Sequence, residues 1–139
     1  MKLILDTSFL IALKRGDKAA RRLLEERRGR AEDIGISRLS QYELLVGALY
    51  MVKKYGDVRE LAWINEALRW LTIYEVEKDV IETAARVKSE SILKGEDLPD
   101  LDLLIALSGK ENSELLTLDE DQIKMAKYLA KYKIIISHP

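Results

Sequence analysis

Hydrophobic and polar positions along this chain follow two spacings, one typical of buried strands and one typical of amphipathic helices. Short apolar runs suit strands covered on both faces, and apolar residues three or four positions apart suit helices. The predicted strands span residues 2–6, 34–37, 72–76, 114–118 and 133–137. The predicted helices span residues 9–13, 18–28, 40–54, 58–70, 79–93, 99–109 and 120–131.

The order of these segments indicates the fold class. Strands alternate with helices along the whole chain, which predicts a three-layer α/β fold with a parallel sheet and right-handed crossovers. No linker, repeat or low-complexity tract interrupts the 139 residues, and this length suits one domain. We therefore expect a single domain that covers residues 1–139.

Composition excludes several classes of function. Hydrophobic residues make up 47% and charged residues 34% of the chain, as in folded soluble proteins. There is no cysteine, so disulfides and thiolate metal sites are excluded. The single histidine, His138, lies beside the C-terminus, which argues against a Ser-His-Asp or Cys-His centre. Since no apolar run approaches the ~20 residues of a membrane span and no signal-peptide pattern opens the chain, we expect a cytoplasmic protein.

The net charge of −1 hides an uneven distribution. Residues 1–30 carry nine Lys and Arg against four Asp and Glu, whereas residues 31–139 carry 14 against 20. The basic segment would suit a phosphate backbone lying beside an acidic pocket. It would equally suit a solvated helix face whose cations pair with Glu25 and Glu26. The sequence leaves both interpretations open.

Four acidic residues lie where this fold would bring them to one edge of the sheet. Asp6 and Asp119 follow predicted strands, while Glu43 and Asp102 lie in the first turns of predicted helices. The carboxyl ends of parallel strands meet at one edge, where ligands bind at the point of reversed strand order. Gathered carboxylates repel one another unless a cation lies between them, and Mg²⁺ and Mn²⁺ prefer oxygen ligands. The pattern therefore predicts a metal site suited to phosphodiester cleavage.

Each acid also has a structural explanation. Asp6 and Asp119 would serve as N-caps of the helices that follow. Glu43 would complete a capping box with Ser40, and Asp102 would complement the dipole of its helix. However, helix caps are commonly Ser, Thr or Asn, which bring no charge. Four carboxylates at one edge therefore favour the metal site.

Four blocks of the sequence resemble the PIN-domain nucleases. Residues 3–11, Leu-Ile-Leu-Asp-Thr-Ser-Phe-Leu-Ile, resemble the opening of that family, and residues 40–48 are similar to its second block. Residues 102–106 and 116–119 match the third and fourth blocks. The compact length resembles the VapC toxin branch in particular. The resemblance implies a three-layer PIN-like fold with a five-stranded parallel sheet in the order 3-2-1-4-5.

The resemblance also implies a metal-dependent endoribonuclease that uses Mg²⁺ or Mn²⁺. The catalytic and metal-binding residues that it implies are Asp6, Glu43, Asp102 and Asp119. Asp6 and Asp102 would be the strongest ligands, and Glu43 would ligate through water or accept a proton. Ser8 and Thr117 would orient the carboxylates through hydrogen bonds.

The same resemblance implies partners: an RNA substrate, a cognate VapB-like antitoxin that fills the acidic cleft, and a second copy in a homodimer. The stripe of Trp63, Ala67 and Trp70 would contribute to such an interface or would simply be core. Family members often carry an aromatic shortly after the last acid, where this chain has Gln122 and Ile123.

Three questions remain open from the sequence. Asp100 is expected to point away from Asp102 on its helix, whereas Asp121 would be able to approach the site. A PIN-like module that binds RNA or protein without catalysis is an alternative function. A PIN nuclease of RNA processing, rather than a toxin, is another.

Overall fold

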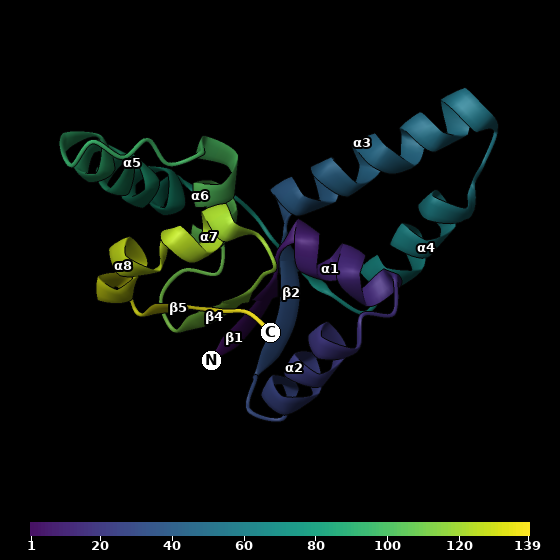
Figure 1. The fold of residues 1–139 in the computed structure, drawn as a ribbon, viewed down its shortest axis with the longest axis horizontal. Helices are drawn as coiled ribbons and strands as arrows, with labels where there is room; N and C mark the ends of the chain where they lie inside the picture. The colour runs from purple at the N-terminus through teal and green to yellow at the C-terminus, as the bar shows by residue number, and fades with distance from the viewer.

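The computed structural model describes all residues from Met1 to Pro139 and is built around a central parallel sheet (Figure 1). The strands are β1 (Lys2–Leu5), β2 (Asp33–Ser37), β3 (Thr72–Tyr74), β4 (Ser113–Leu116) and β5 (Ile134–Ser137). They are ordered β3-β2-β1-β4-β5, which confirms the predicted order, and every neighbouring pair is parallel. The order reverses between β1 and β4, so the carboxyl ends of these two strands flank the switch point.

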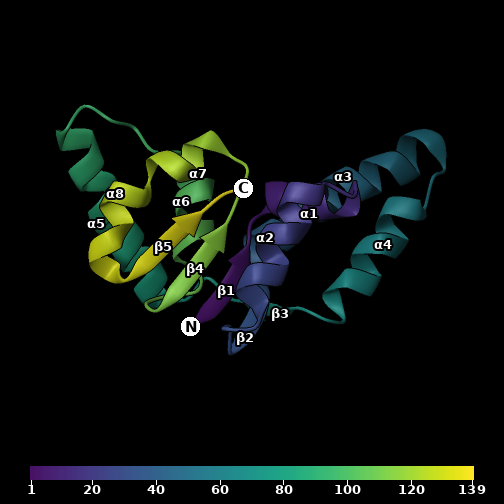
Figure 2. The same ribbon diagram turned by 60° about the horizontal axis from the view of Figure 1, so that its bottom comes forward.

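The helices form two groups on the two faces of the sheet (Figure 1). The first group contains α1 (Thr7–Lys14), α2 (Lys18–Arg28), α3 (Arg38–Tyr55) and α4 (Arg59–Leu68). The second contains α5 (Lys78–Leu93), α6 (Asp100–Leu107), α7 (Glu120–Lys124), α8 (Ala126–Leu129) and the 3₁₀ turn η1 (Ala130–Tyr132). Figure 2 shows β4 and β5 pointing toward the edge where α7 begins.

The alternating side chains of β1 show why the strands read as apolar runs. Leu3 and Leu5 pack into the core beneath the first helix group, whereas Ile4 packs into the core beneath the second. Because successive strand residues face opposite sides of the sheet, a strand covered on both faces is apolar at nearly every position. None of the helices is both long and apolar enough to cross a bilayer.

The start of α3 differs from the prediction. The helix begins at Arg38, and its N-cap is Ser37, whose hydroxyl accepts a hydrogen bond from Leu39 N at 3.1 Å. Ser40 lies inside the helix, fully buried, and its Oγ has no hydrogen-bond partner. The predicted capping box of Ser40 and Glu43 is therefore wrong, and the Glu43 carboxylate is free for another role.

The prediction of one helix over residues 120–131 is correct in type but not in continuity, because the chain forms three short helical segments there, α7, α8 and η1. Gln122, Met125 and Tyr128 are all buried. They are spaced by three, and tight turns with three residues per turn keep such a set on one face. The hydrogen bonds from Met125 N to Gln122 O and from Tyr128 N to Met125 O, at 3.0 and 2.9 Å, tighten the chain accordingly.

Helices α3 and α4 extend beyond the sheet as an arm (Figure 1). Leu49 is 43% exposed, and Trp70, just after α4, is 81% exposed. Trp70 is therefore not a core residue, whereas Trp63 is partly buried and Ile64 is the buried residue of α4. The arm leaves an apolar stripe on α3 uncovered, formed by Tyr42, Val46, Leu49 and Tyr50.

Candidate functional site

The four predicted acids line one cavity at the carboxyl edge of the sheet. The cavity has a volume of about 240 Å³. Its lining consists of Asp6, Thr7, Ser8, Ile11, Glu43, Asp102, Ile105, Asp119 and Gln122. No lysine or arginine lines it, so the protein supplies no cation to balance these carboxylates.

Asp6 is the most firmly held of the four. Its side chain is 3% exposed and caps α1 by accepting from Phe9 N at 2.9 Å. The Ser8 hydroxyl donates to Oδ1 at 2.7 Å, and the Thr117 hydroxyl donates to Oδ2. Burial raises the pKa of Asp6, and these hydrogen bonds oppose that rise by favouring the ionised form. The structure thus makes Asp6 both a helix cap and a wall of the cavity, and places Ser8 and Thr117 as expected.

Ser8 and Thr117 also join the two strand ends. The Ser8 hydroxyl accepts from Leu118 N at 3.1 Å, and the Thr117 hydroxyl accepts from Asp119 N at 2.9 Å. Because β1 and β4 are neighbours in the sheet, these short bonds fix Asp6 and Asp119 on opposite sides of the switch point.

Glu43 reaches the cavity from the first turns of α3. Its Oε1 accepts a hydrogen bond of 2.5 Å from the Thr7 hydroxyl, which belongs to α1. Thr7 was not singled out by the sequence analysis, although it follows Asp6 directly. Its contact with Glu43 depends on the packing of α1 against α3, which no local pattern reveals.

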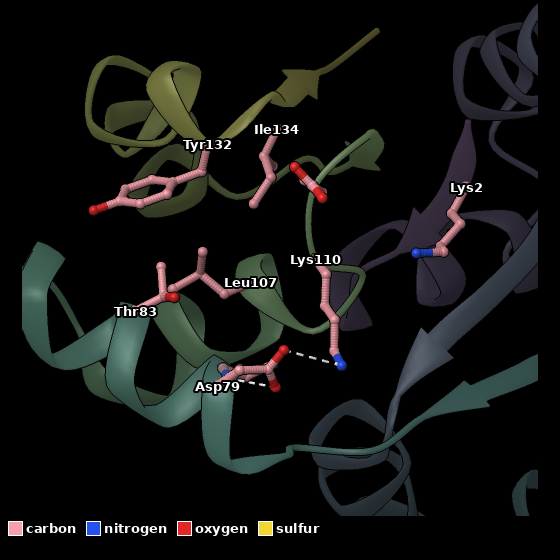
Figure 3. Close-up of a pocket in the computed structure, with 9 residues that line it drawn as sticks. Lys2, Asp79, Thr83, Leu107, Lys110, Tyr132 and Ile134 are labelled. Atoms are coloured by element: carbon pink, nitrogen blue, oxygen red, sulfur yellow. Dashed lines mark hydrogen bonds and ion pairs between the residues drawn. The ribbon is translucent and has the colours of Figure 1, made fainter.

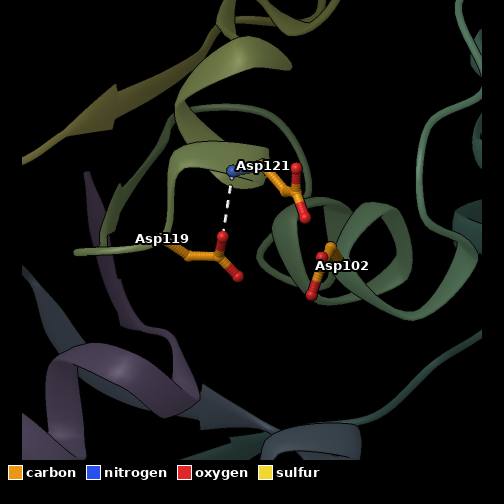
Figure 4. A group of neighbouring side chains, drawn as sticks. All are labelled: Asp102, Asp119 and Asp121. Carbon is orange, nitrogen blue, oxygen red and sulfur yellow. Dashed lines mark hydrogen bonds between the residues drawn. The ribbon is translucent and has the colours of Figure 1, made fainter.

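Asp102, Asp119 and Asp121 come together on the other side of the cavity (Figure 4). One carboxylate oxygen from each lies within 4.8 Å of the others. Asp119 caps α7 by accepting from Asp121 N at 2.9 Å, so the cap brings Asp121 toward the site. Of the two open cases, Asp121 lies beside the site, whereas Asp100 pairs with Lys88 at 3.0 Å and lies outside the cavity lining.

The electrostatics of Asp102 reflect this gathering of charge. Burial, followed by repulsion from Asp119, Glu43, Asp121 and Asp6, raises the pKa of Asp102 to about 6. No hydrogen bond to its carboxylate offsets the rise. Proteins commonly show such a shift where like charges meet at a functional site.

Gln122 supplies an independent indication that a hydrated cation fits this cavity. Its side chain is 1% exposed, and its Nε2 donates to the backbone oxygen of Asp102 at 2.9 Å. Its Oε1 is buried without a hydrogen-bond partner, an arrangement that native proteins seldom leave unsatisfied. Hard divalent cations combine carboxylate ligands with retained water, and such water would donate to this oxygen. The donor set therefore fits Mg²⁺ or Mn²⁺.

A second cavity, of about 360 Å³, lies at the opposite edge of the sheet (Figure 3). Its charges are of both signs: Lys110 contacts Asp79 at 3.1 Å, Lys2 donates to the backbone oxygen of Gly109 at 3.1 Å, and Glu111 also lines the cavity. The acidic cavity, whose charged groups all have the same sign, is the stronger candidate for function.

The basic segment on α2 is in part a paired surface. Arg28 pairs with Glu25 at 3.2 Å, and Arg27 pairs with the buried Glu114 of β4 at 3.1 Å. Lys18, Arg21 and Arg22 remain exposed, and no residue of α2 lines the acidic cavity.

The comparisons with known proteins agree with the fold. The PIN domain family model matches residues 3–128. A search of curated proteins finds no match. The structure resembles VapBC2 from Rickettsia felis bound to a promoter DNA fragment, with a TM-score of 0.78, 20% identity, and coverage of 100% of this chain and 99% of that one. It also resembles VapBC-1 from nontypeable Haemophilus influenzae, with a TM-score of 0.73, 17% identity, and coverage of 99% of this chain and 98% of that one. The likeness to VapBC-5 from Mycobacterium tuberculosis has a TM-score of 0.73, 20% identity, and coverage of 99% of this chain and 98% of that one. At these identities the three likenesses describe the fold.

Proposed function

Because this chain belongs to the PIN-domain family, we propose that its acidic cavity is the catalytic centre of a divalent-cation-dependent endoribonuclease. The observation that carries the proposal is the convergence of Asp6, Glu43, Asp102 and Asp119 on one cavity without a neutralising side chain. We also propose that residues 1–139 act as one domain, with Mg²⁺ or Mn²⁺ as the cation.

A bound divalent cation would make water a stronger nucleophile and offset charge on the scissile phosphate. Asp6, Asp102 and Asp119 would hold the cation, with Ser8 and Thr117 fixing the orientation of the Asp6 carboxylate through hydrogen bonds. Gln122 Oε1 would orient a water molecule by accepting a hydrogen bond from it.

Glu43 is suited to a different role. Its Oε1 is engaged by the Thr7 hydroxyl, which fixes the carboxylate beside the cavity. Its Oε2 is then the free oxygen that would accept a proton from the attacking water. Asp121, exposed at the rim, would add negative charge without being required for the inner set.

The partners follow from the same proposal. The solved neighbours are VapBC toxin–antitoxin complexes, and we place this chain as the toxin half, a homodimer held silent by a VapB-like antitoxin. The apolar stripe on α3, where Tyr42 is 61% and Tyr50 53% exposed, suits an apolar helix of such a partner. An arginine or lysine of the antitoxin would then replace the cation among the carboxylates.

The direct test is cleavage of a mixed structured RNA pool by protein freed of any copurifying partner, with Mg²⁺, Mn²⁺ or EDTA. We expect cleavage with either cation, none with EDTA, and none by Asp6→Asn, because an amide cannot replace the anionic ligand. Asp100→Asn is the matched control and should cleave normally, since Asp100 pairs with Lys88 outside the cavity. Equal cleavage by Asp6→Asn and wild type would refute the assigned centre.

Growth of a host lacking the antitoxin separates a toxin from an RNA-processing nuclease. Expression of the active chain should arrest growth, and Asp6→Asn should not. An active nuclease that leaves growth unchanged would be an RNA-processing enzyme instead. Protein that binds RNA without cutting it under any cation would be a binding module.

A further inference from the structure

A groove between α1, α3 and α4 continues directly from the acidic cavity. It has a volume of about 220 Å³, and it shares Ile11 and Glu43 with the cavity. The apolar part of its wall includes Met51, Trp63 and Ile64, and its charged residues are Lys14, Arg15, Glu43 and Glu60. A substrate bound at the carboxylates would therefore find an apolar recess immediately beside the reacting group.

Gly47 is the least expected residue in the lining of this groove. It lies in the middle of α3, where glycine is less favourable than alanine because it loses more backbone entropy on folding. A Cβ at this position would meet no atom within 4 Å, so packing does not require a glycine here. Glu43 and Met51, one turn before and one turn after it on α3, also line the groove. The missing side chain keeps the groove open against the helix.

At the end of the groove, Arg15 is the one cation without an ion pair and is available to an anion. Lys14 and Arg15 both line it. Lys14 is paired with Glu60 and lies over the Trp63 ring at 5.9 Å, whereas Arg15 is exposed and makes no ion pair. A cationic peptide arm entering the acidic cavity along this path would meet Arg15 with like charge. A nucleotide would instead place its base against the apolar wall and a phosphate at Arg15.

We propose that this groove binds one unpaired nucleobase of single-stranded RNA next to the scissile phosphate, with Gly47 allowing its close approach and Arg15 contacting its phosphate. The inference rests on the proposed nuclease function and deepens it, because it names the residues of this chain that would receive the base beside the scissile phosphate. Protein recognition of RNA sequence typically targets such unpaired bases, and aromatic walls accept them with modest sequence preference.

Binding is measured separately from cleavage by the fluorescence of Trp63. The protein has two tryptophans, so Trp70→Phe makes Trp63 the only reporter, and Asp6→Asn added to it prevents cutting. Titration with a short single-stranded RNA in Mg²⁺ should change the Trp63 emission, and the same RNA annealed to its complement should not. Binding detected by anisotropy without any change in Trp63 emission would overturn the groove assignment.

Cleavage kinetics then test the two residues. Gly47→Leu fills the groove and should raise KM about tenfold, in the range seen when a base contact is lost, with little change in kcat. Arg15→Gln should raise KM and lower the slope of log KM against log salt by about one, as for loss of one phosphate contact. Gly47→Ala should raise the midpoint of thermal unfolding. That result would show that the fold tolerates a side chain at this position.

The matched controls lie on the outer side of α5, where Ala85 and Arg86 are exposed. Ala85→Leu and Arg86→Gln make the same chemical changes away from the groove and should leave KM unchanged. A Gly47→Leu enzyme that cleaves like wild type but escapes inhibition by the antitoxin would assign the groove to the protein partner and overturn the proposal. Failure of wild type to cut or bind any RNA would instead refute the nuclease function itself, and the groove assignment with it.

Discussion

At the scale of single residues, Asp102 responds most directly to the charge of the acidic cavity. Its folded-state pKa of about 6 lies above the value of about 3.9 expected for an unfolded aspartate. The ionised form is therefore disfavoured in the folded state, and the resulting loss of stability is complete above the folded pKa. It disappears as the pH falls through 6 toward 4, because the folded state takes up its proton first.

We expect the metal-free protein, held in EDTA, to unfold at a higher temperature at pH 5 than at pH 7.5. Asp102→Asn should be more stable than wild type at pH 7.5 and should lose much of this pH dependence. Thermal unfolding followed by circular dichroism measures both effects. The raised pKa would be contradicted if the wild-type unfolding temperature were lower at pH 5 than at pH 7.5 and Asp102→Asn showed the same change.

The two spare acids give a paired comparison. Asp121 has a carboxylate oxygen within 4.8 Å of those of Asp102 and Asp119, whereas Asp100 contacts Lys88. Asp121→Asn should weaken the apparent affinity for Mn²⁺ in the cleavage assay by several-fold, because it removes a nearby negative charge. Asp100→Asn should leave that affinity unchanged. The same loss in both variants would show that only overall charge matters.

At the scale of elements, the α3 N-terminus separates what local pattern reveals from what tertiary packing decides. The sequence predicted a helix with Glu43 near its start, and this is correct. The assignment of its cap failed because Ser37 and Ser40 are equally good caps by residue type. Ser37 has the tertiary partner, a hydrogen bond of 2.9 Å donated by Ser108 Oγ of the turn after α6. Ser40 therefore lies inside α3 as a buried residue and caps nothing.

Ser37→Ala should lower the free energy of unfolding by about 1 kcal/mol, since it removes the cap, while the Ser108 hydroxyl keeps its hydrogen bond to the backbone oxygen of Leu104 at 2.7 Å. Ser40→Ala should be neutral or stabilising, because the Ser40 Oγ has no partner to lose. Urea denaturation of the two variants makes the comparison. Greater destabilisation by Ser40→Ala would restore the capping box that the structure contradicts.

At the scale of the whole molecule, the four carboxylates of the acidic cavity come from both helix groups, two from each. Asp6 and Glu43 belong to β1–α1 and α3, whereas Asp102 and Asp119 belong to α6 and the start of α7. The resemblance to the PIN-domain family implied the sheet order, and the meeting of the four acids was predictable because strand ends and helix starts converge on a parallel-sheet edge. The contact of Thr7 with Glu43 and the unpartnered oxygen of Gln122 depend on how distant helices pack, so no sequence spacing indicated them.

The most direct test of this account is calorimetric titration of the metal-free protein with Mn²⁺ at pH 7.5, beside Asp102→Asn. The Asp102 carboxylate accepts no protein hydrogen bond, so the substitution removes a ligand with little other disturbance. We predict saturable binding by wild type, a rise in thermal midpoint with added cation, and loss of both in Asp102→Asn. Absence of saturable binding by wild type, or equal binding by the variant, would contradict a metal centre in the acidic cavity.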